Sequence, residues 1–138
     1  MKFGKRPAPF INVTIKRKDR IVGIITALID TGSPFTAILP SDAEKLRIKA
    51  SPHRGFTVCL AGHKFVAVKC PHLSMMLNST DGQLISFSNP TIILLTLTSP
   101  KERKEVQEIP SIIGNDFLEE NGLALFFNPA KKIAYLEK

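Results

Sequence analysis

The sequence predicts a mostly β chain with two short helices, folded into a closed, barrel-like structure. Many short runs rich in β-branched and aromatic residues are separated by turn residues, and only two short segments have the signals of a helix. The chain has 138 residues, of which 43% are hydrophobic and 22% are charged, as in ordinary globular proteins. We therefore expect one domain spanning residues 1–138.

The first predicted element is a β-hairpin over residues 10–29, with its turn at Lys18–Asp19. Apolar residues alternate in its first strand, whereas the second strand ends in three consecutive apolar residues, 27–29. A strand that is apolar at both parities is covered on both faces. Asp30 therefore follows the end of a buried strand.

A short extended segment and a helix are expected next. Residues 35–39 are apolar and strand-like, and Pro40 ends that run. Ser41 and Glu44 have the spacing of a capping box, which predicts a helix over residues 42–47. A second hairpin is then predicted over residues 56–68, with Gly62 at or near its tip.

The second half of the chain is predicted to contain mainly strands. These are expected at residues 73–77, 84–87, 91–98, 123–127 and 132–136. The charged stretch 101–108 lacks periodic apolar residues, so we expect an exposed loop there. The second short helix is predicted over residues 116–121, where Gly122 ends it.

The sequence Asp30-Thr31-Gly32-Ser33 is the main candidate for a functional site. Paired carboxylates that share a proton can activate a water and polarise a carbonyl group. Gly32 allows a close backbone approach, and Thr31 offers a hydroxyl to stabilise the turn. An ordinary Asx turn is the alternative interpretation of so short a motif. The buried strand before Asp30 and the later Ile112-Ile113-Gly114 favour the site.

At these residues the chain resembles the retropepsin-like aspartic peptidases. Their pattern is an apolar residue before Asp-Thr-Gly-Ala/Ser, then a flap hairpin, then two Ile or Leu residues and a glycine before a short helix. The resemblance implies an acid-protease fold of one lobe that forms a two-fold dimer. It implies an aspartic endopeptidase that hydrolyses peptide bonds of a polypeptide substrate, with Asp30 as the catalytic carboxylate.

The resemblance also implies roles for the residues around Asp30. Thr31 would lock the two active-site loops together across the dimer, and Gly32 would contact substrate through its backbone. Ile112, Ile113 and Gly114 would support the loop, with glycine present because a side chain would collide with it. Ala61, Gly62 and His63 would form the tip of a flap that closes over substrate.

Two positions depart from the retroviral pattern. Ser33 replaces an alanine, and we predict that its hydroxyl donates a hydrogen bond to the Asp30 carboxylate. Asn115 stands where many retroviral enzymes have an arginine that braces the dimer. Dimer contacts are then expected from the terminal strands or from Asp116.

The sequence contains one Asp-Thr-Gly, so a second carboxylate requires a second chain, which predicts a homodimer. Two other functions stay open. The first is a dimeric peptide-binding module without catalysis. The second is a basic nucleic-acid-binding β domain, since the net charge is +7 and four basic residues gather near one turn (Lys16, Arg17, Lys18 and Arg20). Those basic residues lack interleaved aromatics, which disfavours nucleic acid as the main partner.

No apolar run approaches the roughly 20 residues that span a bilayer, and residues 1–9 lack the pattern of a secretory signal. We therefore expect a cytoplasmic protein without membrane contact. Cys59 and Cys70 are expected to be free thiols. With His63 and His72 they offer zinc-binding residue types, but at a spacing typical of no zinc finger, so neither a metal nor a cofactor is expected.

Overall fold

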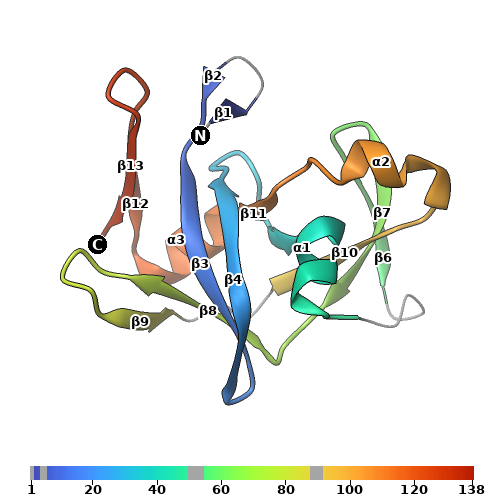
Figure 1. The fold of residues 1–138 in the computed structure, drawn as a ribbon, viewed down its shortest axis with the longest axis horizontal. Helices are drawn as coiled ribbons and strands as arrows, with labels where there is room; N and C mark the ends of the chain where they lie inside the picture. Colours follow the sequence, from blue (N-terminus) through green and yellow to red (C-terminus); the bar gives the residue numbers. More distant parts are fainter. Residues whose placement is uncertain (1, 4–5, 50–54, 88–91) are drawn as a thin grey trace.

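The computed structural model describes residues 2–3, 6–49, 55–87 and 92–138 (Figure 1). Its strands are β1 (Lys2–Phe3), β2 (Arg6–Pro7), β3 (Phe10–Arg17), β4 (Arg20–Ile29), β5 (Thr36–Ile38), β6 (Phe56–Leu60), β7 (His63–Lys69), β8 (Leu73–Asn78), β9 (Leu84–Phe87), β10 (Ile92–Leu97), β11 (Ser111–Ile113), β12 (Ala124–Asn128) and β13 (Ile133–Glu137). Its helices are α1 (Pro40–Leu46), the 3-10 helix η2 (Pro100–Glu102), α2 (Arg103–Val106) and α3 (Asn115–Asn121). The prediction of a mostly β chain is confirmed.

Nine strands form the main sheet, in the order β6-β7-β10-β5-β11-β4-β3-β8-β9. β1 pairs with β2, and β12 pairs with β13, in two separate ribbons. The prediction of a closed structure differs from this arrangement, because β6 and β9 each pair with one neighbour within the described residues. Three of the four residues of β9 are exposed, which agrees with its place at an edge of the sheet.

The β3–β4 hairpin forms as predicted, and Lys18 takes a left-handed φ of 54° in its turn. On its other edge β4 pairs in parallel with β11, from Ser111 opposite Ala27 to Ile113 opposite Ile29. The end of β4 therefore lies inside the sheet, with β3 on one edge and β11 on the other. This placement agrees with its apolar character at both parities.

The later strands also lie close to the predicted ranges. β9 matches residues 84–87, and β8, β10, β12 and β13 each differ from the prediction by one residue at one or both ends. Thr91, the first residue of the predicted strand 91–98, lies outside the described residues.

The predicted capping box of the first helix is wrong. α1 begins at Pro40 instead of Asp42, and no described side chain caps its N-terminus. Proline suits this first helical position because its missing N–H would have no partner there. Asp42 instead accepts a hydrogen bond from the Ser111 hydroxyl at 2.6 Å, which ties α1 to β11.

The predicted loop at 101–108 is also wrong, since η2 and α2 occupy most of it. Val106 is fully buried, and Ile109 packs against the same cluster. One buried side chain is enough to dock a single helical turn, whereas a periodic pattern needs several turns to be recognised. α3 ends at Gly122 as predicted, with a φ of 61°. None of the helices in the described ranges is long and apolar enough to cross a membrane.

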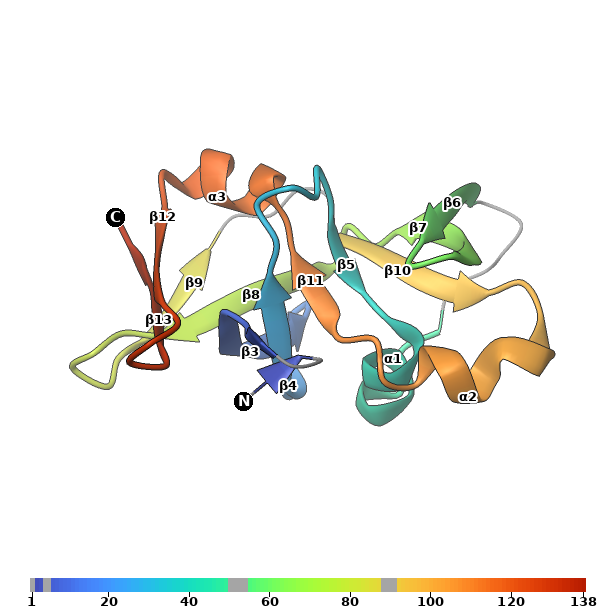
Figure 2. The same ribbon diagram turned by 90° about the horizontal axis from the view of Figure 1, so that it is seen from above.

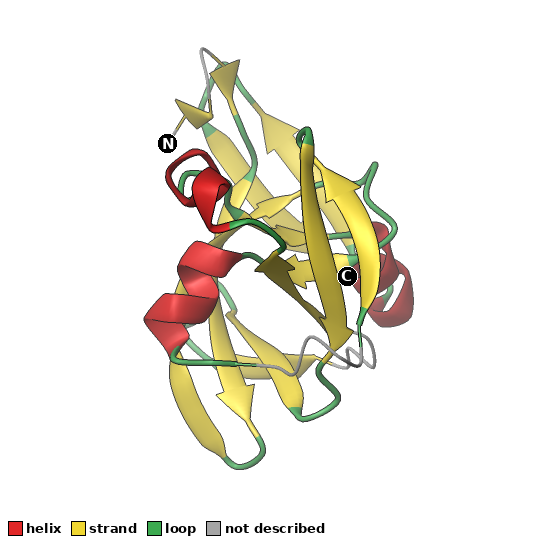
Figure 3. Ribbon diagram, turned by 90° about the vertical axis from the view of Figure 1, so that its right-hand side faces the viewer, coloured by secondary structure: helices red, strands yellow, loops and turns green. Residues whose placement is uncertain are grey.

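The helices lie on two sides of the main sheet. α1 and α2 lie on one side and α3 lies on the other (Figure 3). Seen from above, the loop after β4 and the β6–β7 hairpin lie on the α3 side (Figure 2). Two clusters of buried apolar residues fill the interior, a larger one centred on β3, β4 and β8 and a smaller one under the β6–β7 hairpin.

Candidate active site

Asp30 is the first residue after β4, and both its backbone and its side chain are held in place. Its N–H donates to the carbonyl oxygen of Ile113 at 2.9 Å. Its Oδ1 accepts a hydrogen bond from the Gly32 N–H at 3.0 Å. The side chain is half-buried. β11 thus fixes the position of the loop, and the loop orients the carboxylate.

Gly114 lies against the loop that carries Asp30. A Cβ at this position would lie 2.1 Å from the carbonyl oxygen of Phe35 and 2.8 Å from that of Ser33. The Asn115 N–H donates to the Ser33 carbonyl oxygen at 2.7 Å. Because the opposing atoms belong to the backbone, no side chain fits here without moving the loop.

A buried threonine connects the same loop to α3. The Thr36 hydroxyl donates to Asp116 Oδ1 at 2.7 Å and accepts from the Gly114 N–H at 3.1 Å. The Thr36 N–H lies 3.3 Å from Asp116 Oδ2, its acceptor. Thr36 has no exposed surface. The sequence analysis did not single out Thr36. Its position as a polar residue within the otherwise apolar run 35–39 is the signal that could have identified it.

Asp116, which was expected as a possible dimer contact, accepts hydrogen bonds within its own chain. Both of its carboxylate oxygens accept hydrogen bonds from Thr36, and Oδ1 also accepts from the Phe117 N–H at 2.8 Å. The carboxylate therefore connects the start of α3 to β5 within one chain.

Ser33 does not make the predicted hydrogen bond to Asp30. Its hydroxyl donates to the Phe35 carbonyl oxygen at 2.9 Å and accepts from the Phe35 N–H at 3.2 Å. Serine hydroxyls often bond to backbone groups two residues away, and here that local bond competes with the carboxylate. Ser33 therefore shapes the turn after Asp30.

The β6–β7 hairpin turns at Ala61 and Gly62, whose φ values are 51° and 80°. Two consecutive positive φ values are typical of a type I′ hairpin turn. His63 is the first residue of β7, and its half-buried imidazole faces the η2–α2 segment. Nδ1 lies 3.4 Å from Glu102 Oε1, and Nε2 lies 3.8 Å from Glu105 Oε2.

A cleft of about 280 Å³ lies between the Asp30 loop and the body of this hairpin. The loop contributes Asp30, Gly32 and Ser33, and β6 contributes Val58, Cys59 and Leu60. Its remaining walls are mostly apolar and include Phe35, Ala37, Ala67, Ile93, Leu95 and Ile112. The three predicted tip residues 61–63 and Thr31 are not among its described lining residues.

The two cysteines differ in environment. Cys59 is exposed and Cys70 is half-buried, and neither forms a disulfide. Burial raises the pKa of the Cys70 thiol, although a hydrogen bond from the Leu94 backbone and the charge of Arg17 oppose this shift. Across the described residues, no three His, Cys, Asp or Glu side chains are grouped as metal ligands.

Comparison with known proteins identifies the fold. No protein-family model matches the sequence, and no curated protein matches it. The solved structure of EIAV protease, complexed with the inhibitor HBY-793, matches with a TM-score of 0.50 over 92% of this chain and 100% of that chain, at 15% identity. A retropepsin-like aspartic protease from Rickettsia conorii matches with a TM-score of 0.47 over 86% of this chain and 82% of that chain, at 18% identity. The chain therefore has the retropepsin-like fold.

Proposed function

We propose that this chain is an aspartic endopeptidase, that Asp30 is its catalytic carboxylate and that residues 1–138 act as one peptidase domain. The observation that carries the proposal is the placement of the Asp30 carboxylate in an apolar cleft beneath a β-hairpin. The similar EIAV structure is named as a protease, which supports it. An extended peptide lying in this cleft would present its backbone to Asp30 and its apolar side chains to Val58, Leu60 and Leu95.

The mechanism requires a second carboxylate, which we propose comes from a second copy of the chain. Two copies of Asp30 related by a two-fold axis would share one proton, one carboxylate deprotonating a water while the other polarises the scissile carbonyl.

The β12–β13 hairpin offers a surface for this dimer. Three large apolar side chains on it are exposed, namely Phe126, Ile133 and Tyr135. The rings of Phe126 and Tyr135 stack with centroids 4.8 Å apart. We propose that this apolar face packs against its counterpart in the second chain, where residues 124–137 would take the role expected of the terminal strands.

The decisive experiment compares two aspartate substitutions in the full chain. Asp30→Asn is expected to lower peptide hydrolysis by at least about 10⁴-fold, the scale on which catalytic groups act. Asp19→Asn, at an exposed turn remote from the cleft, is expected to hydrolyse as the parent does. Hydrolysis of a diverse peptide mixture at acidic to neutral pH, followed by mass spectrometry, measures both. Undiminished hydrolysis by Asp30→Asn would end the proposal.

The shared site also predicts a concentration dependence. Because separated chains would have half a site each, activity per chain should fall on dilution below the dimer dissociation constant. Sedimentation velocity at the same concentrations locates that constant. Tyr135→Glu, which places a charge in the proposed interface, should shift both the sedimentation and the activity transitions to higher concentration. A monomer with full activity would contradict the shared site.

A further inference from the structure

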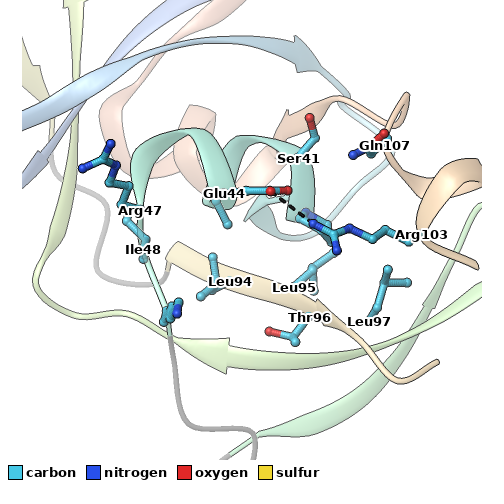
Figure 4. Close-up of a pocket in the computed structure, with 13 residues that line it drawn as sticks. Ser41, Glu44, Arg47, Ile48, Leu94, Leu95, Thr96, Leu97, Arg103 and Gln107 are labelled. Atoms are coloured by element: carbon cyan, nitrogen blue, oxygen red, sulfur yellow. Dashed lines mark hydrogen bonds and ion pairs between the residues drawn. The ribbon is translucent and has the colours of Figure 1, made fainter. Parts of the chain in front are cut away.

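A second, larger cavity lies on the side of the sheet opposite the Asp30 loop. It has a volume of about 710 Å³ and lies between α1, α2 and the last residues of β10 (Figure 4). Figure 2 shows α1 and α2 on the side opposite the loop that follows β4. Leu95 lines both cavities, so β10 separates them. We call this cavity the β10 groove, defined by Pro40, Glu44 and Arg47 on one side, Arg103 and Gln107 on the other and residues 94–97 below.

The β10 groove contains an unpaired strand edge. β10 pairs in parallel with β5 only from Ile92 to Leu94, whereas its pairing with β7 continues to Leu97. After Ile38 the chain turns into α1. Across the described residues, no strand therefore pairs with this edge of β10 beyond Leu94.

The direction of the backbone groups follows from the ladder with β7. The Cys70 N–H donates to the Ile92 carbonyl oxygen at 2.8 Å, so the backbone groups of Ile92 face β7. Backbone direction alternates along a strand, and therefore Leu95 and Leu97 direct their N–H and C=O groups toward the groove side. The two residues after β5, Leu39 and Pro40, offer no backbone donor to this edge of β10. The Leu39 N–H is bonded to the Ser111 hydroxyl, and proline has no N–H.

The rim of the groove is basic. Arg47, Lys49 and Arg103 line it, and Glu44 is its one acidic residue. Arg103 and Glu44 form an ion pair of 3.1 Å across the groove, and both side chains are more than half exposed. Such exposed pairs are weak, so an incoming carboxylate can exchange with Glu44 at small cost. Two cations, Arg47 and Lys49, stand beyond this pair.

We propose that the β10 groove binds an extended acidic segment of a separate protein, which adds to the free edge of β10 as a further strand. Backbone hydrogen bonds to Leu95 and Leu97 would fix the segment, as in other cases of strand addition. Apolar side chains of the segment would enter the groove, and its carboxylates would pair with Arg47, Lys49 and Arg103. A second copy that presented the same groove would bring two basic rims together, which disfavours it as the occupant.

The test uses the full-length Asp30→Asn protein, so that peptides remain uncut, and three pools of labelled octapeptides. The first pool alternates glutamate with Val, Leu or Ile, the second has lysine in place of glutamate, and the third is the glutamate pool with N-methylated backbone amides. Fluorescence anisotropy should show saturable binding of the glutamate pool alone. N-methylation removes the backbone donors while the side chains stay, so equal binding of the third pool overturns the proposal.

Matched protein variants locate the site. Lys49→Gln/Arg103→Gln should weaken binding of the glutamate pool by about two- to five-fold for each cation removed. Lys18→Gln/Arg20→Gln, with the same change of charge at the β3–β4 turn, should leave binding unchanged. Equal losses in both variants, or no binding of the glutamate pool at millimolar concentration, would refute the proposal. An altered sedimentation coefficient of Lys49→Gln/Arg103→Gln alone would assign the groove to a second copy and would also refute it.

The proposal stands apart from the peptidase activity. Binding is measured with the carboxylate of Asp30 removed, so its failure says nothing about catalysis. Conversely, an inactive chain that binds the glutamate pool would leave the β10 groove as its one supported site. Thermal unfolding of each variant must first show the melting temperature of its parent, which ensures that the differences in binding do not come from unfolding.

Discussion

The Asp30 loop and the β6–β7 hairpin face each other across the cleft, yet they are stabilised in different ways. The loop is joined by hydrogen bonds to residues about 80 positions away, with Thr36 bonded to Gly114 and to Asp116 in the interior. The strand β7 of the hairpin pairs with β10, but the tip of the hairpin depends on a local two-residue turn and on the contacts of His63 with Glu102 and Glu105. The catalytic role proposed for Asp30 requires a fixed direction, whereas the hairpin over the cleft would have to let a substrate enter. The difference predicts that equivalent substitutions cost far more in the loop.

The largest expected effect is that of Gly114→Ala. The added methyl would collide with the carbonyl oxygens of Phe35 and Ser33, so we expect a loss of about 3 kcal/mol in the free energy of unfolding. Gly62→Ala is the matched control in the hairpin, where a Cβ meets no atom within 4 Å. Its left-handed φ alone should cost about 1 kcal/mol. Urea unfolding measures both, and equal losses would contradict the contrast between the regions.

Thr36→Val should have the next largest effect. Valine keeps the shape of the side chain but leaves the Gly114 N–H without its acceptor and removes the hydroxyl that donates to Asp116 Oδ1, at a cost of about 2 kcal/mol. The control is Thr26→Val on β4, whose hydroxyl donates to Asn12 Oδ1 in an exposed bond. That change should alter stability by less than about 0.5 kcal/mol. A Thr36→Val protein as stable as its control would show that the buried bonds add nothing.

The same comparison explains how much of the molecule could be predicted from sequence. The β3–β4 hairpin and the place of Asp30 at the end of a buried strand follow from local alternation and from apolar residues 27–29, which a single sequence displays. The Thr36–Asp116 bond joins residues far apart in the chain, and nothing local identifies Asp116 as its partner. The sequence alone therefore suggests a surface role for this carboxylate.

Local competition explains the other differences. The sequence offers two candidate acceptors for the Ser33 hydroxyl, the Asp30 carboxylate and the Phe35 carbonyl, and does not rank them. Ser41 and Glu44 had the spacing of a capping box, yet Pro40 at the first helical position set the start of α1. Val106 docks α2 through one buried side chain, too little for a periodic signal. Patterns predict elements well, whereas single contacts decide their ends.

A smaller effect is expected for the contact that holds the hairpin to the η2–α2 segment. His63→Ala removes both ion pairs, and since Glu102 and Glu105 are partly exposed, the loss should be below about 1 kcal/mol. The difference in stability from the parent should shrink in 1 M salt, because salt screens exposed charges. His72→Ala, at an exposed position without such a pair among the described residues, serves as the control. A salt-independent loss would assign the contribution of His63 to packing.

The smallest effect concerns the two thiols and leaves the fold intact. Cys59 is exposed on the hairpin, whereas burial raises the pKa of half-buried Cys70, so less of Cys70 is thiolate at a given pH. Iodoacetamide at pH 8 should therefore alkylate Cys59 first, as peptide mass spectrometry would show, and the two rates should converge in urea.

The raised pKa of Cys70 also means that the folded state keeps the Cys70 proton to a higher pH than the unfolded state does. This contribution to stability is present below the unfolded pKa and is lost as the pH rises from there through the folded pKa. Cys70→Ser should accordingly flatten the decline of stability at alkaline pH, and alkylation of Cys70 at the rate of Cys59 in the folded protein would contradict its burial.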